Sequence, residues 1–168
     1  RLRAVLPQRD QLSFGFSVAE VVRLGRLPCP DLPPEQERAI IDAALERTGV
    51  GHLRERRYPS LSGGERARVQ LARVLAQIWA PVELGPRALL LDEPTASLDL
   101  AHQHRCLRLA REFAAEGVAV IVVLHDPNLA MSYADEATLL CCGEMIANGA
   151  PESVLTPEHL SRIYGVEV

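Results

Sequence analysis

The chain has 168 residues, and all 18 of its basic side chains are arginine, which excludes any chemistry that needs a lysine amine within it. Against 22 acidic residues the net charge is −4, and this argues against a general nucleic-acid-binding protein, since such a surface carries a basic stripe. The length and a hydrophobic content of 48% indicate roughly one globular domain. Charged residues interrupt every apolar run well before the roughly 18 residues that a membrane span needs.

After a short strand expected over residues 3–7, the first half of the chain is predicted to be mostly helical. Ser17 and Glu20 have the spacing of a capping box, in which each side chain bonds the other residue's backbone at a helix start. Farther on, apolar residues up to Ile78 recur on one helical face. The predicted helices span 17–27, 34–48 and 63–78, with a proline-rich break before the second and an irregular basic connector, 50–60, before the third.

The second half alternates strands with helices. Residues 118–124 are apolar without alternation, which is typical of a strand buried on both faces. The predicted order is strand 88–91, helix 98–116, strand 118–124, helix 127–134, two short strands around 137–148 and helix 157–164. This alternation favours an α/β fold with a parallel sheet.

The cysteines, Cys29, Cys106, Cys141 and Cys142, have no C-x-x-C spacing and are interpreted as buried free thiols. Side chains of adjacent residues point to opposite faces of a strand. Cys141 and Cys142 are therefore expected to be poorly placed to share a metal ion.

The first candidate binding motif lies immediately before the helix predicted over 63–78. Its residues are Leu61, Ser62, Gly63, Gly64 and Glu65. Glycine lets a ligand approach the backbone closely, and the free N–H groups at a helix N-terminus bind phosphate. The alternative interpretation is an ordinary helix start capped by Ser62.

A second motif places two adjacent carboxylates, Asp92 and Glu93, directly after the apolar strand 88–91. Ligands of α/β sheets bind at the carboxyl ends of strands. One carboxylate can hold Mg²⁺, and the other can orient or deprotonate a water molecule that attacks a γ-phosphate. The alternative is a solvated turn after a strand.

Three further polar residues follow predicted strands or precede a predicted helix. Asp99 follows the paired acids and is a candidate site residue. It can also cap the helix predicted over 98–116. His125 follows the strand 118–124 and could donate to a γ-phosphate oxygen, while Gln8 follows the first strand and could contact Mg²⁺ and water.

In this order and spacing, the motifs resemble those of the ATP-binding subunits of ABC transporters. Gln8 matches the family's Q-loop, residues 61–65 the signature motif, residues 89–93 the Walker B strand, residues 97–99 the D-loop and His125 the switch histidine. The resemblance implies an ATPase that binds ATP and Mg²⁺, with Glu93 and His125 catalytic and Gln8 and Asp92 contacting the metal, partly through water. It also implies a homodimer in which residues 61–65 and Asp99 of one subunit help to bind the nucleotide held by the other.

The family's Walker A loop, with its lysine, has no counterpart here, so the chain is expected to be the C-terminal part of such a subunit and inactive alone. The resemblance implies a P-loop NTPase core with a helical subdomain. It divides the chain into residues 1–8 (end of a core strand and Q-loop), 9–75 (helical subdomain ending in the signature motif and its helix) and 76–168 (remaining core).

Residues 99–104 and the last six residues look like those of bacterial heme (hemin) importers. Importers of ferric siderophores or vitamin B12 stay open as alternatives, as does a soluble ABC ATPase outside transport. His102 and His104 are not expected to bind heme, because residues two apart face different directions on a helix. The implied partners are membrane permease subunits and, indirectly, a periplasmic binding protein. The implied location is the cytoplasmic face of the bacterial inner membrane, and Glu20 and Arg26 are candidate rim contacts to the permease.

Overall fold

The computed structural model describes residues 2–8, 15–79 and 85–165 and divides the chain into two compact units, Arg1–Val123 and Leu124–Val168. Among the described residues, the first unit contains two hydrophobic cores and the second unit contains one.

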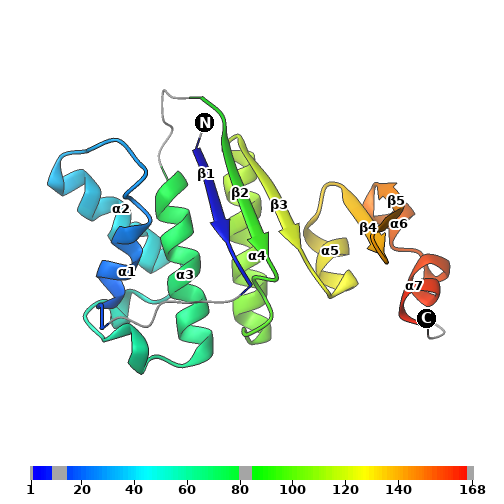
Figure 1. Ribbon diagram of the computed structural model, residues 1–168, viewed down its shortest axis with the longest axis horizontal. Coiled ribbons are helices and arrows are strands. Elements are labelled where there is room, and N and C mark those ends of the chain that lie inside the picture. Colours follow the sequence, from blue (N-terminus) through cyan, green and yellow to red (C-terminus); the bar gives the residue numbers. More distant parts are fainter. Residues whose placement is uncertain (1, 9–14, 80–84, 166–168) are drawn as a thin grey trace. The chain divides into compact units, whose positions relative to one another are not determined.

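A three-stranded parallel sheet forms the centre of the first unit (Figure 1). Its strands are β1 (Leu2–Leu6), β2 (Arg87–Asp92) and β3 (Val118–Val123), with β2 in the middle. Leu6 pairs with Leu91, and Asp92 pairs with Val123, so the three strands end at one edge. The parallel sheet and the α/β class predicted from the sequence are confirmed.

Two helices, α3 (Gly63–Ile78) and α4 (Leu100–Ala115), pack on the same face of this sheet. Leu75 and Phe113, from α3 and α4, are almost fully buried against strand residues such as Leu89. On the opposite face the side chains of Ile121 and Val123 are 63% and 48% exposed. The prediction that residues 118–124 are buried on both faces is therefore wrong. The physical reason is that α3 and α4, the two helices of this unit that pack on the sheet, both cover its other face.

Helices α1 (Val18–Leu24) and α2 (Pro34–Arg47) pack with α3 around a second hydrophobic core. The predicted capping box at α1 is confirmed, because the Ser17 N–H donates to the Glu20 carboxylate at 2.7 Å and the Glu20 N–H donates to the Ser17 hydroxyl at 3.3 Å. The connector predicted over 50–60 contains two short 3₁₀ turns, Gly51–Leu53 and Tyr58–Ser60. Helix α3 is thus shared by both cores of the first unit.

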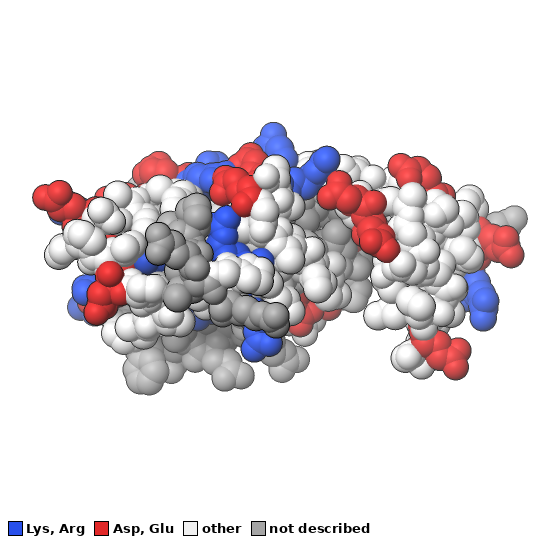
Figure 2. All heavy atoms as spheres, turned by 90° about the horizontal axis from the view of Figure 1, so that it is seen from above, with Lys and Arg blue, Asp and Glu red and all other residues white. Residues whose placement is uncertain are grey.

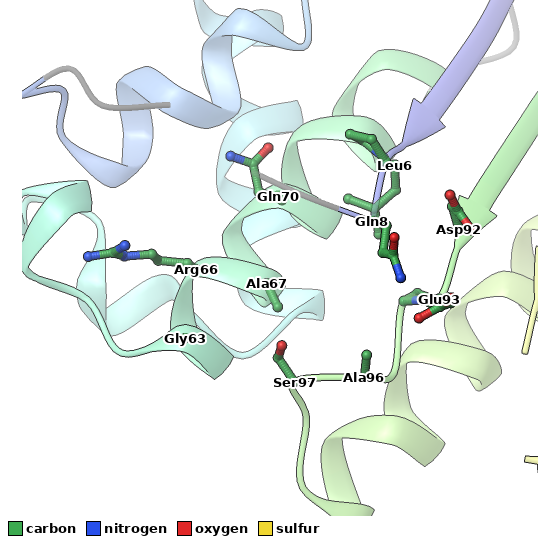
Figure 3. A pocket seen from close by; sticks show the side chains of 12 residues that line it. Leu6, Gln8, Gly63, Arg66, Ala67, Gln70, Asp92, Glu93, Ala96 and Ser97 are labelled. Carbon is green, nitrogen blue, oxygen red and sulfur yellow. The ribbon is translucent and has the colours of Figure 1, made fainter. Parts of the chain in front are cut away.

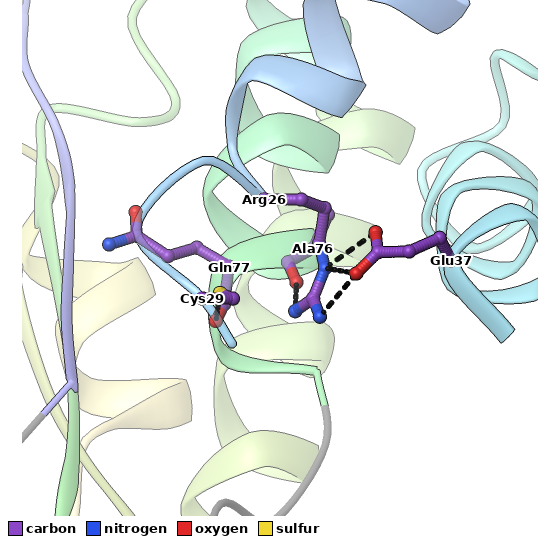
Figure 4. A network of polar contacts seen from close by, with 5 residues as sticks. All are labelled: Arg26, Cys29, Glu37, Ala76 and Gln77. Carbon is purple, nitrogen blue, oxygen red and sulfur yellow. Dashed lines mark hydrogen bonds and ion pairs between the residues drawn. The ribbon is translucent and has the colours of Figure 1, made fainter. Parts of the chain in front are cut away.

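A buried ion pair ties the segment after α1 to α2 and α3 (Figure 4). Arg26 is 8% exposed; its Nη2 donates to Glu37 at 2.9 Å, and its Nη1 donates to the carbonyl oxygen of Ala76 at 3.0 Å. Close by, the Cys29 thiol donates to the carbonyl oxygen of Gln77 at 3.2 Å. Arg26 is therefore a structural residue, and the expectation that it is a surface rim contact is wrong, because burial and its two partners, Glu37 and Ala76, hold it inside.

Arginine side chains also bind the last carbonyl groups of other helices. Arg87 donates to Ile78, at the end of α3, at 2.8 Å and to Glu116, just after α4, at 2.9 Å. Arg105 donates to two carbonyl oxygens at the end of α2, those of Glu46 and Arg47, at 3.0 and 2.8 Å. The carbonyl groups of the last helical turn have no partner within the helix, so these guanidinium groups act as C-terminal caps.

The second unit contains α5 (Pro127–Tyr133), the antiparallel pair β4 (Ala137–Cys141) and β5 (Glu144–Gly149), and the helices α6 (Pro151–Val154) and α7 (Pro157–Tyr164). Its core is built around Val154, Leu155 and Leu160. Helix α6 was not expected from the sequence, because it has only four residues. The other elements agree with the predicted order.

Among the cysteines, only Cys106 is buried, and burial raises its pKa to about 12. Cys142 and Gly143 form the two-residue turn between β4 and β5, with φ values of 51° and 83°. Turns of this kind need positive φ at both central residues. The strand ends at Cys141, and the two adjacent thiol sulfurs lie 3.7 Å apart. The expectation that Cys141 and Cys142 point to opposite faces is wrong, since only one of them belongs to the strand.

Figure 2 shows arginine and acidic side chains interspersed over the visible face of the described residues. Across the parts of the chain that the structure describes, no helix combines the length and the apolar character that crossing a membrane requires.

Candidate functional site

The carboxyl ends of β1 and β2 bring three of the predicted site residues together. Asp92 is the last residue of β2, Glu93 follows it, and Gln8 comes two residues after β1. Because β1 and β2 run parallel in register, their polar extensions emerge at the same edge of the sheet. Figure 3 shows the Gln8 amide pointing toward Glu93, with Asp92 beside them at the end of its strand.

A cavity of about 250 Å³ lies at this edge. Its walls are the two strand ends, the turn after β2 and the first half of α3. The polar or flexible residues that line it are Gln8, Gly63, Arg66, Gln70, Asp92, Glu93 and Ser97. Four of the predicted site residues (Gln8, Gly63, Asp92 and Glu93) therefore share one cavity.

Glu93 has a left-handed backbone, with φ of 48°. A non-glycine residue in this region carries strain of about 1 kcal/mol or more, and such residues cluster at functional sites. Two backbone hydrogen bonds hold it: its N–H donates to the carbonyl of Val123, and its own carbonyl accepts from Ala96, both at 3.2 Å. Pro94, with its fixed φ, follows in the turn. The backbone thus turns sharply to present the Glu93 carboxylate at the cavity.

The predicted phosphate-binding residues form a capped helix start. Ser62 and Glu65 make a capping box, in which the Ser62 N–H donates to the Glu65 carboxylate at 2.7 Å. This backbone hydrogen bond is the main cause that lowers the pKa of Glu65, and the Ser62 hydroxyl contributes next. Leu61 is buried beneath the helix start. The capping interpretation is therefore correct for Ser62 and Glu65, and it leaves the N-terminal end of α3 well defined.

The two glycines of this motif differ in their surroundings. A Cβ atom on Gly63 would have no non-local atom within 4 Å, so this residue lies in open space at the cavity wall. A Cβ atom on Gly64 would lie 3.1 Å from the carbonyl oxygen of Ser97. Gly64 therefore lets the start of α3 come close to the turn that carries Glu93.

Asp99 does not line the cavity and instead caps α4. Its carboxylate accepts from the His102 N–H at 2.9 Å and lies 2.7 Å from His102 Nδ1. The backbone hydrogen bond is the first cause that lowers the Asp99 pKa, followed by the contact with the His102 side chain. The alternative interpretation of Asp99 as a helix cap is correct, and a role toward a second subunit stays a prediction.

His125 belongs to the second unit, and its carbonyl oxygen accepts a hydrogen bond from the Tyr164 hydroxyl at 3.0 Å. The role predicted for its ring stays a prediction.

Arg66 and Gln70 line the cavity but were not predicted from the sequence to be site residues. Together with Gly63 and Ala67 they fall at i, i+3, i+4 and i+7, so they share one face of α3. Gln70 donates to the Tyr58 hydroxyl at 2.8 Å, and the Arg66 guanidinium lies 5.9 Å from the centre of the Tyr58 ring. The same helical spacing that predicted the apolar face of α3 could have identified this polar one.

The donor set at the cavity suits Mg²⁺ bound together with a phosphate ligand. Gln8 and Asp92 offer an amide and a carboxylate oxygen, which are the ligand types that Mg²⁺ prefers. Among the described residues, no group of three or more His, Cys, Asp or Glu side chains could hold a metal ion. Mg²⁺ is usually held by one or two carboxylates, with waters and substrate phosphates as its other ligands.

Comparison with known proteins agrees with this geometry. Two proteins named hemin import ATP-binding protein HmuV, from Gloeobacter violaceus and Deinococcus radiodurans, are 55% and 54% identical over 99% of the chain. The chain spans 61% and 63% of the length of these relatives.

Among solved structures, a metal-chelate type ABC transporter in an inward-facing conformation matches with a TM-score of 0.82 and 29% identity, over 99% of this chain and 64% of that one. CbiO1 of Clostridium perfringens, part of the ABC transporter complex cbiONQ, matches with a TM-score of 0.74 and 32% identity, over 95% and 61%. The family model described as ABC transporter matches residues 2–96, which include both strand ends, the start of α3 and the turn after β2. The chain belongs to the ABC transporter family of ATP-binding proteins.

Proposed function

We propose that the complete protein is the ATP-hydrolysing subunit of an ABC importer for hemin. The observation that carries the proposal is the cavity at which Gln8, Asp92 and the strained Glu93 meet. Similarity to relatives named as hemin import proteins supports the cargo. The metal-chelate transporter among the structural neighbours favours a second cargo class, a ferric siderophore or another metal chelate such as vitamin B12.

In the proposed mechanism ATP lies against the strand ends. Gln8 and Asp92 would hold Mg²⁺, which would supply positive charge beside the phosphate oxygens. The Glu93 carboxylate accepts a hydrogen bond from the attacking water and polarises it, and His125 donates to a γ-phosphate oxygen. Most of the rate enhancement then comes from positioning and electrostatic stabilisation, as is usual in phosphoryl transfer.

The second half of the proposed site comes from another copy of the subunit. Ser62 caps a 16-residue helix that begins with Gly63 and Gly64, and the backbone N–H groups at this helix start attract anions. We assign this helix start, with Leu61, Glu65 and Asp99 around it, to the γ-phosphate held by the partner subunit. The corresponding division of the chain is core residues 1–8, a helical subdomain over 9–75 and the remaining core over 76–168.

The proposed partners are membrane permease subunits and, through them, a periplasmic binding protein that delivers the cargo. The proposed location is the cytoplasmic face of the bacterial inner membrane. Reconstituting the complete importer in vesicles tests the cargo: hemin is expected to stimulate ATP hydrolysis, and stimulation by a ferric siderophore or vitamin B12 alone would contradict the hemin assignment.

The test of the catalytic assignment is Glu93→Gln in the full-length protein. The amide keeps the size of the side chain and one acceptor oxygen, but it has no charge and cannot act as a base. ATP binding is therefore expected to persist while kcat falls by at least about 100-fold. Glu35→Gln, which removes an exposed carboxylate on α2, is the matched control and should keep normal turnover. Turnover of the Glu93→Gln protein near that of the control would contradict the role of Glu93.

A further inference from the structure

The side chain of Gln103, on the first turns of α4, holds the turn that carries Glu93. Its amide nitrogen donates to the carbonyl oxygen of Leu98 at 3.0 Å and makes a longer contact, 3.4 Å, to that of Thr95. Gln103 is partly buried and is not part of the cavity wall. It therefore contacts the backbone of the turn from the side of the helix.

The turn needs such support because its first residue is strained. A left-handed glutamate persists only when the surrounding structure over-determines its backbone. Within the turn, the Ala96 N–H donates to Glu93 and the Leu98 N–H donates to Thr95. Thr95 and Leu98 are buried, so their carbonyl oxygens have little access to water, and the Gln103 amide supplies a donor to both.

Helix α4 gives Gln103 a fixed position. Asp99 caps its start, and Cys106 and Leu109 bury its inner face against the sheet. A hydrogen bond from a well-packed helix transmits that rigidity to the turn, which lies between two elements of the same core. The start of α3 also borders the turn, since a Cβ atom on Gly64 would lie 3.1 Å from the carbonyl oxygen of Ser97.

We infer that Gln103 is a positioning residue for the reaction: through the carbonyl groups of Thr95 and Leu98 it keeps the Glu93 carboxylate in place for the attacking water. This inference rests on the proposed function of Glu93. Gln103 makes no contact with the nucleotide in this scheme, so its loss changes turnover and leaves ATP affinity unchanged.

The test compares Gln103→Leu with Gln77→Leu in the full-length protein. Gln77 also donates a side-chain amide hydrogen bond to a backbone carbonyl, that of Arg3 at 3.0 Å, but far from the turn. Gln103→Leu is expected to lower kcat by about 10-fold to 100-fold, since small misplacements of catalytic groups have effects of this size, with the Kd for ATP within twofold. Gln77→Leu is expected to keep kcat within twofold.

A double variant separates positioning from general destabilisation. In a Glu93→Gln background there is no carboxylate to position, so adding Gln103→Leu is expected to leave the small residual turnover unchanged. A kcat of Gln103→Leu equal to that of the control, or an equal further loss in the Glu93→Gln background, would overturn the inference. Should Gln103→Leu fail to fold, Gln103→Glu, which keeps the size but removes the donor, takes its place with the same expectations.

The two proposals fail in different ways. Normal turnover of the Glu93→Gln protein would contradict the proposed function itself. An inactive Glu93→Gln protein together with a fully active Gln103→Leu protein would contradict only the role of Gln103 and leave the proposed function standing.

Discussion

At the scale of single residues, polar side chains in this protein act mainly through the backbone. Ser17, Ser62 and Asp99 each accept a backbone N–H at the start of a helix, and Glu20 and Glu65 bond back to the capping residue. Each such cap stabilises the first turn of its helix by satisfying a backbone N–H that has no partner within the helix. The candidate site also depends on such a cap. The capping box of Ser62 and Glu65 orders the start of α3, whose free N–H groups can then bind an anion.

The capping boxes predict an acid-dependent stability. Hydrogen bonds from Ser62 lower the pKa of Glu65 below its ordinary value of 4.5. A lowered pKa in the folded state means that this stabilisation is complete above about pH 4.5 and is lost as the pH falls through the lowered value. Glu65→Gln is therefore expected to show a smaller drop in Tm between pH 5 and pH 3 than the parent chain.

Thermal unfolding followed by circular dichroism over that pH range measures the effect. Glu152→Gln, at an exposed glutamate that belongs to neither capping box, serves as the control. An identical drop in Tm for Glu65→Gln and the parent would contradict the explanation.

At the scale of helices and strands, local signals explain most of what could be predicted. The helix starting at Gly63 was predictable because its cap and its apolar periodicity are both local. The strand ends that carry Gln8 and Asp92 were predictable because parallel strands end at a common edge.

Features that depend on tertiary packing were not predictable in this way. The burial of Arg26 depends on α2 and α3 closing around it, and the exposure of Ile121 depends on which face the helices cover. The role of Gln103 depends on a turn that folds back on its helix. The strain at Glu93 has one local signal, the proline that follows it, but that signal does not specify a left-handed backbone.

Because Arg87 caps both α3 and α4, lysine is not expected to replace it fully. Arg87 is 8% exposed and donates from two different nitrogens to Ile78 and Glu116. Arg87→Met is expected to lower the free energy of unfolding by about 2–4 kcal/mol, because two charged hydrogen bonds, one buried and one partly buried, are lost. Arg87→Lys is expected to recover only part of this, since a single ammonium group does not have the fork geometry of a guanidinium.

Denaturant unfolding of the purified variants measures these free energies. Arg108→Lys, at an exposed position on α4, is the control and should change stability by less than about 0.5 kcal/mol. Equal stability of Arg87→Lys and the parent would show that the two-carbonyl geometry is unimportant.

At the scale of the whole molecule, the cores predict which parts unfold together. Leu75, on α3, is fully buried in the sheet core, and Ala72 and Ala76 of the same helix belong to the helical core. Leu75→Ala is expected to cost about 3 kcal/mol and to increase hydrogen exchange in both α2 and β2. Leu160→Ala, in the separate core of the second unit, is expected to increase exchange only after residue 124.

Hydrogen exchange resolved by peptide distinguishes these outcomes. Unchanged protection of α2 in Leu75→Ala would mean that the two cores of the first unit unfold independently, although they share a helix.

The arginine caps on α2, α3 and α4 have a further consequence for how the molecule responds to its chemical surroundings. A guanidinium group keeps its proton at any pH at which the chain stays folded, whereas a lysine ammonium group loses its proton in strongly alkaline solution. Acetylation and amine-directed labels find no side-chain amine in the 168 residues. The ends of these helices are thus held by charges that neither base nor acylation can remove.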